Sequence, residues 1–216
     1  IKASGLAAGK GVLLPETREE AAKLLQQILL EDRFGEAGNQ VVLEERLYGR
    51  ELSVLAFCDG ANLTIMPPAQ DHKRLMEGDY GPNTGGMGAY TPSPLVTPEL
   101  IHDVETQVLR PVLNGCNAEG MPYKGVLYAG IMQTDTGSDN GHIKVLEFNC
   151  RFGDPETQVV VPLMQNDIID TFEACIDGTL ASNQPQWSRD AATTVVMAAP
   201  GYPGEYPKGV EIDGIA

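Results

Sequence analysis

The segment "KVLEFNCRFGDPE", residues 144–156, carries Glu147, Asn149 and Arg151 at every second position. Successive side chains of a β-strand point to opposite faces, so these three would share one face. Carboxylate and amide oxygens are hard ligands suited to magnesium, which takes few protein ligands and fills its shell with water and substrate phosphates. The Arg151 guanidinium suits a carboxylate or phosphate held in a bidentate fork. The pattern predicts a magnesium site beside an anion site, rather than a solvated strand face with a Glu–Arg pair.

The first twelve residues, "IKASGLAAGKGV", form a second candidate site. The segment is not a Walker A motif, because three residues instead of four separate Gly5 from Gly9, and Gly11 stands where that motif has Ser or Thr. A flexible glycine-rich hairpin loop has backbone N–H groups that can fold over phosphates. Taken alone, the pattern leaves a plain glycine-rich hairpin equally open.

A third candidate is the long segment from Pro67 to Pro98, which is dense in Gly and Pro and has no sustained periodicity. Such a composition is typical of a linker or of disorder. The segment also carries three adjacent basic side chains, at residues 72–74, and long loops inside compact domains are usually functional. The sequence therefore favours an active-site loop over a linker.

Helices and strands around these segments are marked by period and by caps. A helix is predicted over residues 17–30, where Thr17 and Glu20 form a capping-box pattern. Further helices are predicted to begin at Thr97–Pro98 and at Asp167. Asp59–Gly60 predicts a hairpin turn. Strands are predicted for "QVVLEERL", "ELSVLAFCDG", "ANLTIM", "GVLYAGIMQT", "HIKVLEFNCRF" and the segment beginning "TVVM".

Composition excludes several classes of protein. A chain of 216 residues with 42% hydrophobic residues can bury a real core. A net charge of −15 disfavours sequence-independent binding to nucleic acid or anionic lipid, and no apolar run approaches the roughly 18 residues of a membrane span. The four cysteines are widely spaced, without a C-x-x-C pair, which indicates reduced thiols and a cytoplasmic location. The chain lacks an initiating Met and opens in a strand-like run, so we expect a fragment of a longer protein.

Four motifs together resemble the ATP-grasp core of the glycinamide ribonucleotide synthetase family, the phosphoribosylamine–glycine ligases. They are "IKASGLAAGKGV", "QDHKRLMEGDYGPNTGGMGAY", "GVLYAGIM" and "EFNCRFGDPETQ", and the resemblance covers essentially the whole chain. It implies an α+β ATP-grasp fold with two α+β subdomains gripping ATP. The small subdomain would span residues 1–62 and the large one residues 63–190, with the start of a C-terminal domain at residues 191–216.

The resemblance also implies an activity. The enzyme would use ATP to join glycine to 5-phosphoribosylamine through glycyl phosphate, giving glycinamide ribonucleotide, ADP and phosphate in de novo purine biosynthesis. The cofactors would be ATP and magnesium, with manganese as an alternative ion. The parent would be monofunctional or, as in animal members of the family, fused to later purine-pathway enzymes.

Site residues follow from the same resemblance, position by position. Lys2 would reach the nucleotide phosphates and act in catalysis, and Arg151 would hold the glycine carboxylate and the acyl phosphate. The loop over the phosphates, the adenine hinge and the ribose site would use Ser4, Gly5, Gly9, Lys10, Gly11, Glu44, Glu45, Leu47 and Glu51. The metal ligands would be Glu147 and Asn149. The other substrate residues would be Asp71, Lys73, Asn83, Gly85, Gly86, Asp154 and Glu156.

One departure from the wider ATP-grasp pattern concerns the metal. Many of these enzymes supply a third acidic ligand from the preceding strand, but "GVLYAGIM" contains none. Two protein ligands are therefore expected. Two alternatives stay open: another ATP-grasp carboxylate–amine ligase, or a fragment that binds ATP without catalysis. The 67–94 loop argues against the first, and the joint presence of a carboxylate, an amide and a guanidinium argues against the second.

Overall fold

The structure, a computed structural model, describes residues 1–5, 7, 11–134 and 143–214. Two of the predicted site residues, Gly9 and Lys10, lie outside these ranges. The chain divides into two compact units, Ile1–Tyr48 and Gly49–Ala216. The subdomain boundaries predicted after residues 62 and 190 remain predictions.

The first unit is a short hairpin with one helix. Strand β1 (Lys2–Ala3) pairs antiparallel with β2 (Val41–Val42), and a bridge joins Lys2 to Val12, so the chain returns beside its start as predicted for a hairpin. Helix α1 (Arg18–Leu29) and a 3-10 turn, η1 (Gly35–Gly38), follow. The Oγ of Thr17 accepts the N–H of Glu20 at 3.1 Å, which confirms the predicted helix cap.

The strand predicted for "QVVLEERL" is wrong beyond Val42, because residues 43–48 form no ladder. A side chain fixes this segment instead. The guanidinium of Arg46 donates to the carbonyl of Pro15 at 2.9 Å and to the carboxylate of Glu16 at 2.7 Å.

The second unit is built on a four-stranded antiparallel sheet in the order β10-β9-β3-β4. Strand β3 (Gly49–Asp59) pairs with β9 (Lys124–Thr134) along its whole length, and β4 (Leu63–Ile65) and β10 (Ile143–Asn149) flank them. The predicted hairpin at Asp59–Gly60 is confirmed. The carboxylate of Asp59 accepts the N–H groups of Ala61 and Asn62, and Gly60 supplies the positive φ of 97° that the turn requires.

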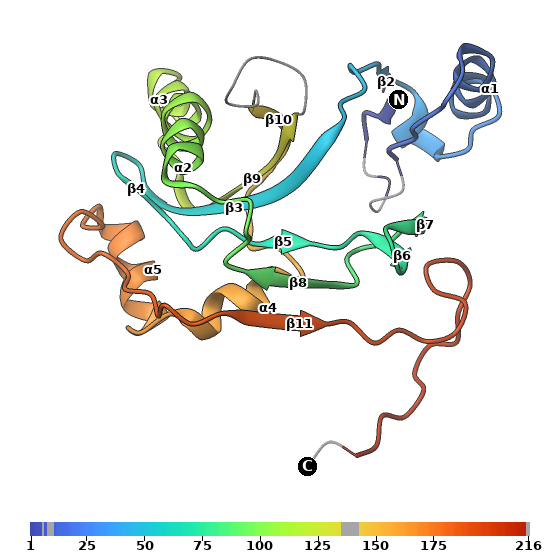
Figure 1. Ribbon diagram of the computed structural model, residues 1–216. Coiled ribbons are helices and arrows are strands. Elements are labelled where there is room, and N and C mark those ends of the chain that lie inside the picture. The colour runs from blue at the N-terminus through green and yellow to red at the C-terminus, as the bar shows by residue number, and fades with distance from the viewer. Residues whose placement is uncertain (6, 8–10, 135–142, 215–216) are drawn as a thin grey trace. The chain divides into compact units, whose positions relative to one another are not determined.

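Helices cover both faces of this sheet, as Figure 1 shows. On one face, α2 (Pro98–Val104), the π-helical turn η2 (Glu105–Leu109) and α3 (Arg110–Ala118) pack on Leu52, Val54 and Ala56. On the other face, Leu55 and Phe57 contact α4 (Thr157–Val160) and α5 (Ile168–Asp177). The 3-10 turn η3 (Val161–Leu163) follows α4. The predicted starts of α2 and α5 are confirmed, since Thr97 and Asp167 each cap with their side chain.

The Pro67–Pro98 segment contains four short strands, so the prediction of a loop without secondary structure is wrong. Strands β5 (Gln70–Asp71) and β8 (Gly88–Thr91) join β11 (Ala192–Val195) in a sheet of order β11-β8-β5. Strands β6 (Arg74–Met76) and β7 (Tyr80–Asn83) form a separate hairpin. Each strand spans two to four residues, which is too short for a hydrophobic period to mark it in sequence.

No helix in the described part of the chain has both the length and the apolar character needed to cross a bilayer.

We predict that Thr17→Ala weakens the start of α1. The Glu20 N–H loses its acceptor, which costs about 1 kcal/mol at a helix cap. Hydrogen exchange of the Glu20 amide measures the effect locally, and Thr17→Ser, which keeps the hydroxyl, is the matched control. Equal exchange in the Ala and Ser variants would contradict the prediction.

Candidate functional site

The predicted metal ligands lie together on β10. The Nδ2 of Asn149 donates to Oε1 of Glu147 at 3.2 Å, which confirms that the two side chains share a face. Glu147 stands opposite Gly130 on β9, where a Cβ would lie 3.4 Å from the Glu147 Cγ. Glu147 is exposed and Asn149 half-buried, so a cation can reach both oxygens. Among the described residues, no three His, Cys, Asp or Glu side chains gather as metal ligands.

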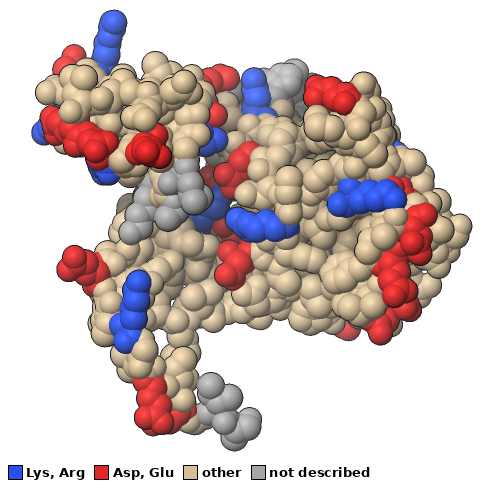
Figure 2. Space-filling model, turned by 180° about the vertical axis from the view of Figure 1, so that it is seen from behind, with Lys and Arg blue, Asp and Glu red and all other residues tan. Residues whose placement is uncertain are grey.

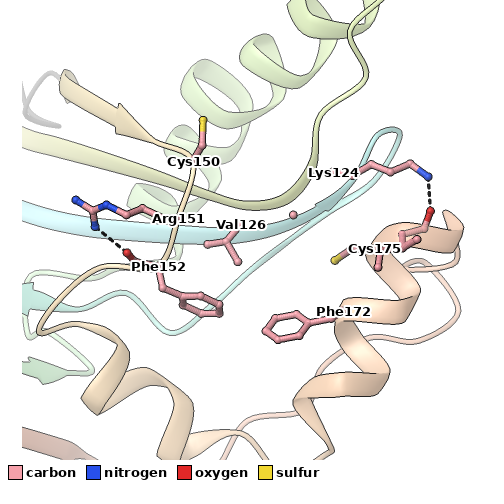
Figure 3. Close-up of a pocket in the computed structure, with 9 residues that line it drawn as sticks. Lys124, Val126, Cys150, Arg151, Phe152, Phe172 and Cys175 are labelled. Atoms are coloured by element: carbon pink, nitrogen blue, oxygen red, sulfur yellow. Dashed lines mark hydrogen bonds between the residues drawn. The ribbon is translucent and has the colours of Figure 1, made fainter. Parts of the chain in front are cut away.

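Arg151 lies beyond the end of β10, which is shorter than predicted and stops at Asn149. Its guanidinium donates to the carbonyl of Phe152 at 2.8 Å and points away from Phe172 (Figure 3). The ion pairs within the described ranges include none between Arg151 and Glu147. The strand-face pair of Glu and Arg that the sequence left as an alternative is therefore wrong for the described structure, because the strand ends before Arg151.

A cavity of about 380 Å³ lies next to Arg151, on the side of the sheet that carries α5 (Figure 3). Phe152 and Phe172 line it, with ring centroids 6.2 Å apart in an edge-to-face contact. Lys124 closes another side and donates to the carbonyl of Ile176. The lining is chiefly apolar, and the predicted substrate residue Arg151 is part of it.

Lys73 is the centre of an acidic cluster. Its Nζ lies 2.8 Å from Oε2 of Glu51 on β3 and 4.0 Å from Oδ2 of Asp71 on β5. Burial alone lowers the pKa of Lys73, but the charges of Asp71, Glu51 and Glu147 outweigh it, and the pKa is raised. Lys73 therefore stays protonated. The structure thus brings together four predicted residues from three site classes: ribose, substrate and metal.

Asp71 is the least exposed carboxylate of this cluster, with 6% of its side chain accessible. Burial raises its pKa to about 6, and the charges of Glu156 and Glu51 add to the shift while Lys73 opposes it. The proton of Asp71 therefore leaves close to neutral pH.

The glycine-rich turn between β7 and β8 meets the segment after Arg151. Gly86 has φ of 122°, and a Cβ there would lie 2.4 Å from Cδ of Pro155. The N–H of Thr84 donates to the carbonyl of Lys73 at 2.7 Å, which holds the turn beside the acidic cluster. Two segments that the sequence assigned to substrates, around Gly86 and Asp154, therefore touch.

Other predicted substrate residues lie at the edges of this contact. Asn83 is exposed and stands opposite Arg74 in the β6–β7 hairpin. The N–H of Gly85 donates to the hydroxyl of Tyr202 at 2.9 Å, a contact that the sequence analysis missed. Asp154 is exposed and accepts from Gln158 at 2.7 Å.

Glu156 differs from the other predicted substrate residues because it is buried, with 3% of its surface accessible. Its Oε1 accepts from the hydroxyls of Ser53 at 2.7 Å and Tyr128 at 3.1 Å. Sequence reasoning missed both hydroxyls. The signal was their presence in otherwise apolar strands, "LSVLAF" and "VLYAG".

The predicted nucleotide residues of the first unit are held by the unit itself. The Nζ of Lys2 lies 3.4 Å from Oε1 of Glu44. The N–H groups of Ser4 and Gly5 donate to the carbonyls of residues 40 and 37, and a Cβ on Gly5 would lie 2.5 Å from the Cα of Ala37. A Cβ on Gly11 would lie 2.8 Å from that of Ala7. Predicted hinge residues Glu45 and Leu47 lie in the segment without a ladder.

Charges on one face of the molecule appear in Figure 2. The Lys and Arg side chains visible there are scattered, several of them beside Asp and Glu, and the described residues on that face form no continuous basic patch.

We predict that titration of Asp71 makes stability pH-dependent. Its pKa is about 6 in the folded protein against an ordinary 3.8, so its contribution to stability is complete below pH 3.8 and is lost as pH rises to 6. At about 1.4 kcal/mol per pH unit, the loss reaches about 3 kcal/mol. Relative to the native chain, Asp71→Asn should therefore gain stability between about pH 4 and pH 7 in urea unfolding. Parallel pH curves for the two proteins would contradict this.

We predict that Gly86→Ala is destabilised by its contact with Pro155. The new methyl group would meet the rigid proline ring, in addition to the strain of a positive φ. Gly125→Ala is the matched control, because its φ is 120° and nothing lies within 4 Å of its added Cβ. We expect thermal unfolding to place Gly86→Ala about 1–3 kcal/mol below the control. Equal stability would show that the turn moves away freely.

Sequence comparison identifies the family of this chain. Residues 1–157 match the family described as phosphoribosylglycinamide synthetase, ATP-grasp (A) domain. This match covers the acidic cluster, the glycine-rich turn and the Glu147–Asn149 pair.

Relatives with assigned names agree with this match. The chain is 54% identical to the trifunctional purine biosynthetic protein adenosine-3 of Bos taurus over 215 residues, covering 99% of this chain and 21% of that protein. It is 51% identical to a phosphoribosylamine–glycine ligase of Nostoc sp. over 216 residues, covering 100% of this chain and 50% of that protein.

A solved structure shows the same fold. The crystal structure of phosphoribosylamine–glycine ligase from Thermotoga maritima matches with a TM-score of 0.81 and 37% identity, over 95% of this chain and 50% of that one. The chain thus spans about half the length of these bacterial relatives. It has an α+β ATP-grasp fold, and it belongs to the phosphoribosylglycinamide synthetase family.

Proposed function

We propose that the protein is an ATP-dependent ligase that joins glycine to 5-phosphoribosylamine through glycyl phosphate, giving glycinamide ribonucleotide, ADP and phosphate. The observation that supports it most strongly is the pairing of Glu147 with Asn149 beside the cluster around Lys73, in a chain of this family. Relatives that are about twice as long carry the name phosphoribosylamine–glycine ligase. The activity is proposed for the whole protein of which these residues form the site.

Glu147 and Asn149 would hold magnesium, or manganese in its place. Both offer an oxygen from an accessible strand face, and the amide of Asn149 can turn its oxygen toward the same point as the Glu147 carboxylate. The ion, when bound, neutralises charge on the nucleotide phosphates. Two protein ligands suffice for magnesium, since water and phosphate oxygens complete its shell.

The reaction needs positioning and charge stabilisation more than a strong base. A glycine carboxylate oxygen attacks the γ-phosphorus of ATP, and the bond to ADP breaks. The amine nitrogen of phosphoribosylamine then attacks the glycyl carbonyl carbon, phosphate leaves, and the amine loses a proton to the departing phosphate or to water. Arg151, whose guanidinium is exposed, would hold the carboxylate and then the acyl phosphate.

The remaining assignments are proposals from the family pattern. In the first unit, Lys2 and the loop from Ser4 to Gly11 would meet the phosphates, and the segment from Glu44 to Leu47 the adenine. Glu51 would meet the ribose hydroxyls. The contact of Gly86 with Pro155 supports placing both substrate segments at one site.

Two properties of the whole protein belong to the same proposal. A cytoplasmic location fits the four cysteines, all of which are free thiols. Fusion to other purine-pathway enzymes would follow the pattern of the relative that is named trifunctional.

We predict that Glu147→Gln abolishes magnesium-dependent nucleotide binding, because it removes one charge at nearly constant volume. Titration calorimetry with a non-hydrolysable ATP analogue, with and without magnesium, should show at least a roughly tenfold loss of the magnesium-dependent affinity. Glu173→Gln, on the exposed side of α5, is the control with the same charge change. In the complete protein, turnover should fall with binding.

Unchanged magnesium dependence in Glu147→Gln would overturn the metal assignment. If the native chain itself bound no analogue, a circular dichroism melt would separate a misfolded chain from a site that needs residues outside these 216.

A further inference from the structure

Glu156 is a buried carboxylate whose two hydrogen-bond donors are uncharged hydroxyls. Its Oε1 accepts from the hydroxyls of Ser53 and Tyr128, and these two hydroxyl oxygens lie 2.9 Å from each other. Burial, together with the charge of Glu156, raises the pKa of Tyr128, so the phenol keeps the proton that it donates. None of the ion pairs within the described ranges includes Glu156. Glutamate is almost never fully buried unless it is paired with a cation, which argues for a role of Glu156 other than stability.

The turn that contains Glu156 is built around its carboxylate. A Cβ on Gly153 would lie 2.4 Å from Oε2 of Glu156, so any side chain there would displace the carboxylate. The N–H of Thr157 donates back to the carbonyl of Gly153 at 3.2 Å and closes the turn. The glycine of the "FGDPE" motif is therefore explained by the close approach of a neighbouring side chain.

Three parts of the candidate site are connected to the Glu156 carboxylate through one or two neighbouring residues. Ser53, on β3, exchanges two backbone hydrogen bonds with Ala69, at 2.8 and 3.0 Å, two residues before Asp71. Pro155, next to Glu156 in the chain, packs on Gly86. Tyr128 stands opposite Asn149 in the β9–β10 ladder. The sheet contacts Glu156 directly through Ser53 and Tyr128, whereas β5 and the glycine-rich turn connect to it through neighbouring residues.

The charge of Glu156 also reaches the acidic cluster. Asp71 is surrounded by Lys73 from its own segment, Glu51 from β3, Tyr128 from β9 and Glu156 from the start of α4, and Glu147 on β10 acts on Lys73. Glu156 and Glu51 raise the pKa of Asp71, after burial, whereas Lys73 lowers it. Lys73, whose Nζ lies 4.0 Å from Oδ2 of Asp71, exerts the largest of these charge effects, and Glu156 opposes it.

We propose that Glu156 is a positioning residue that touches no substrate. Its buried carboxyl group anchors the turn Gly153–Thr157 on Ser53 and Tyr128, and it lies near enough to Asp71 to act on that side chain electrostatically. Through the turn it sets where Pro155 meets Gly86, and through Asp71 it acts on Lys73. The effect of Glu156 on catalysis rests on the proposed ligase function. Its hydrogen bonds and its effect on Asp71 can be tested in the 216-residue chain without any substrate.

The first test measures the titration midpoint of Asp71 by carboxyl carbon NMR in the native chain and in Glu156→Gln. Glutamine keeps the acceptor oxygen and the volume but removes the charge. We expect the Asp71 midpoint to fall by about half a pH unit or more, because a like charge has been removed. A folded Glu156→Gln chain with an unchanged Asp71 midpoint would overturn the electrostatic part of the proposal.

The second test measures anchoring and does not depend on the folding of Glu156→Gln. Tyr128→Phe removes one donor and leaves the Glu156 side chain itself unchanged. We expect amide hydrogen exchange at Thr157 and Val160 to rise about tenfold, the size expected for a lost hydrogen bond to a charged group. Thr171→Val is the matched control, since the Thr171 hydroxyl is buried on α5 without a hydrogen-bond partner. Exchange equal to that of the control would overturn the anchoring role.

Discussion

The antiparallel pairing of β3 with β9 is the constraint on which the rest of the second unit depends. It runs without a break from Gly49 opposite Thr134 to Asp59 opposite Lys124. From Leu52 to Asp59 both faces of β3 are buried in two different clusters, which fixes the register, because a slip of one residue would exchange the side chains of the two faces. Strand β3 therefore places Glu51 near its exposed end and Ser53 in its buried part, each in a fixed position relative to β9 and β10.

Sequence predicts those parts of this structure that local chemistry decides. The cap residues Thr17, Thr97 and Asp167 each begin a helix as expected, because a side-chain oxygen that can accept an orphan N–H acts within one turn. The shared face of Glu147 and Asn149 follows from the period of a strand. Both are arguments over a few neighbouring residues.

Arguments from neighbouring residues could not predict contacts between segments that are distant in the sequence. Strand β8 of the Pro67–Pro98 segment pairs with β11, about a hundred residues further on. The Glu156 carboxylate was assigned to a substrate, but its neighbours Ser53 and Tyr128 lie 103 and 28 residues away in sequence. Burial of this kind depends on tertiary packing, and a motif that marks a residue as important leaves open whether the residue touches a ligand.

The π-helical turn between α2 and α3 has a consequence for insertions and deletions. Its five-residue step from Val104 to Leu109 replaces the usual four, and Leu109 and Leu113 thereby face the same side of the sheet as Leu100 and Val104. One residue of an α-helix corresponds to about 100° of rotation. A deletion of one residue within 105–109 would restore the four-residue step of a regular α-helix and keep the apolar stripes of α2 and α3 aligned, whereas an insertion there would turn the stripe of α3 away from the sheet.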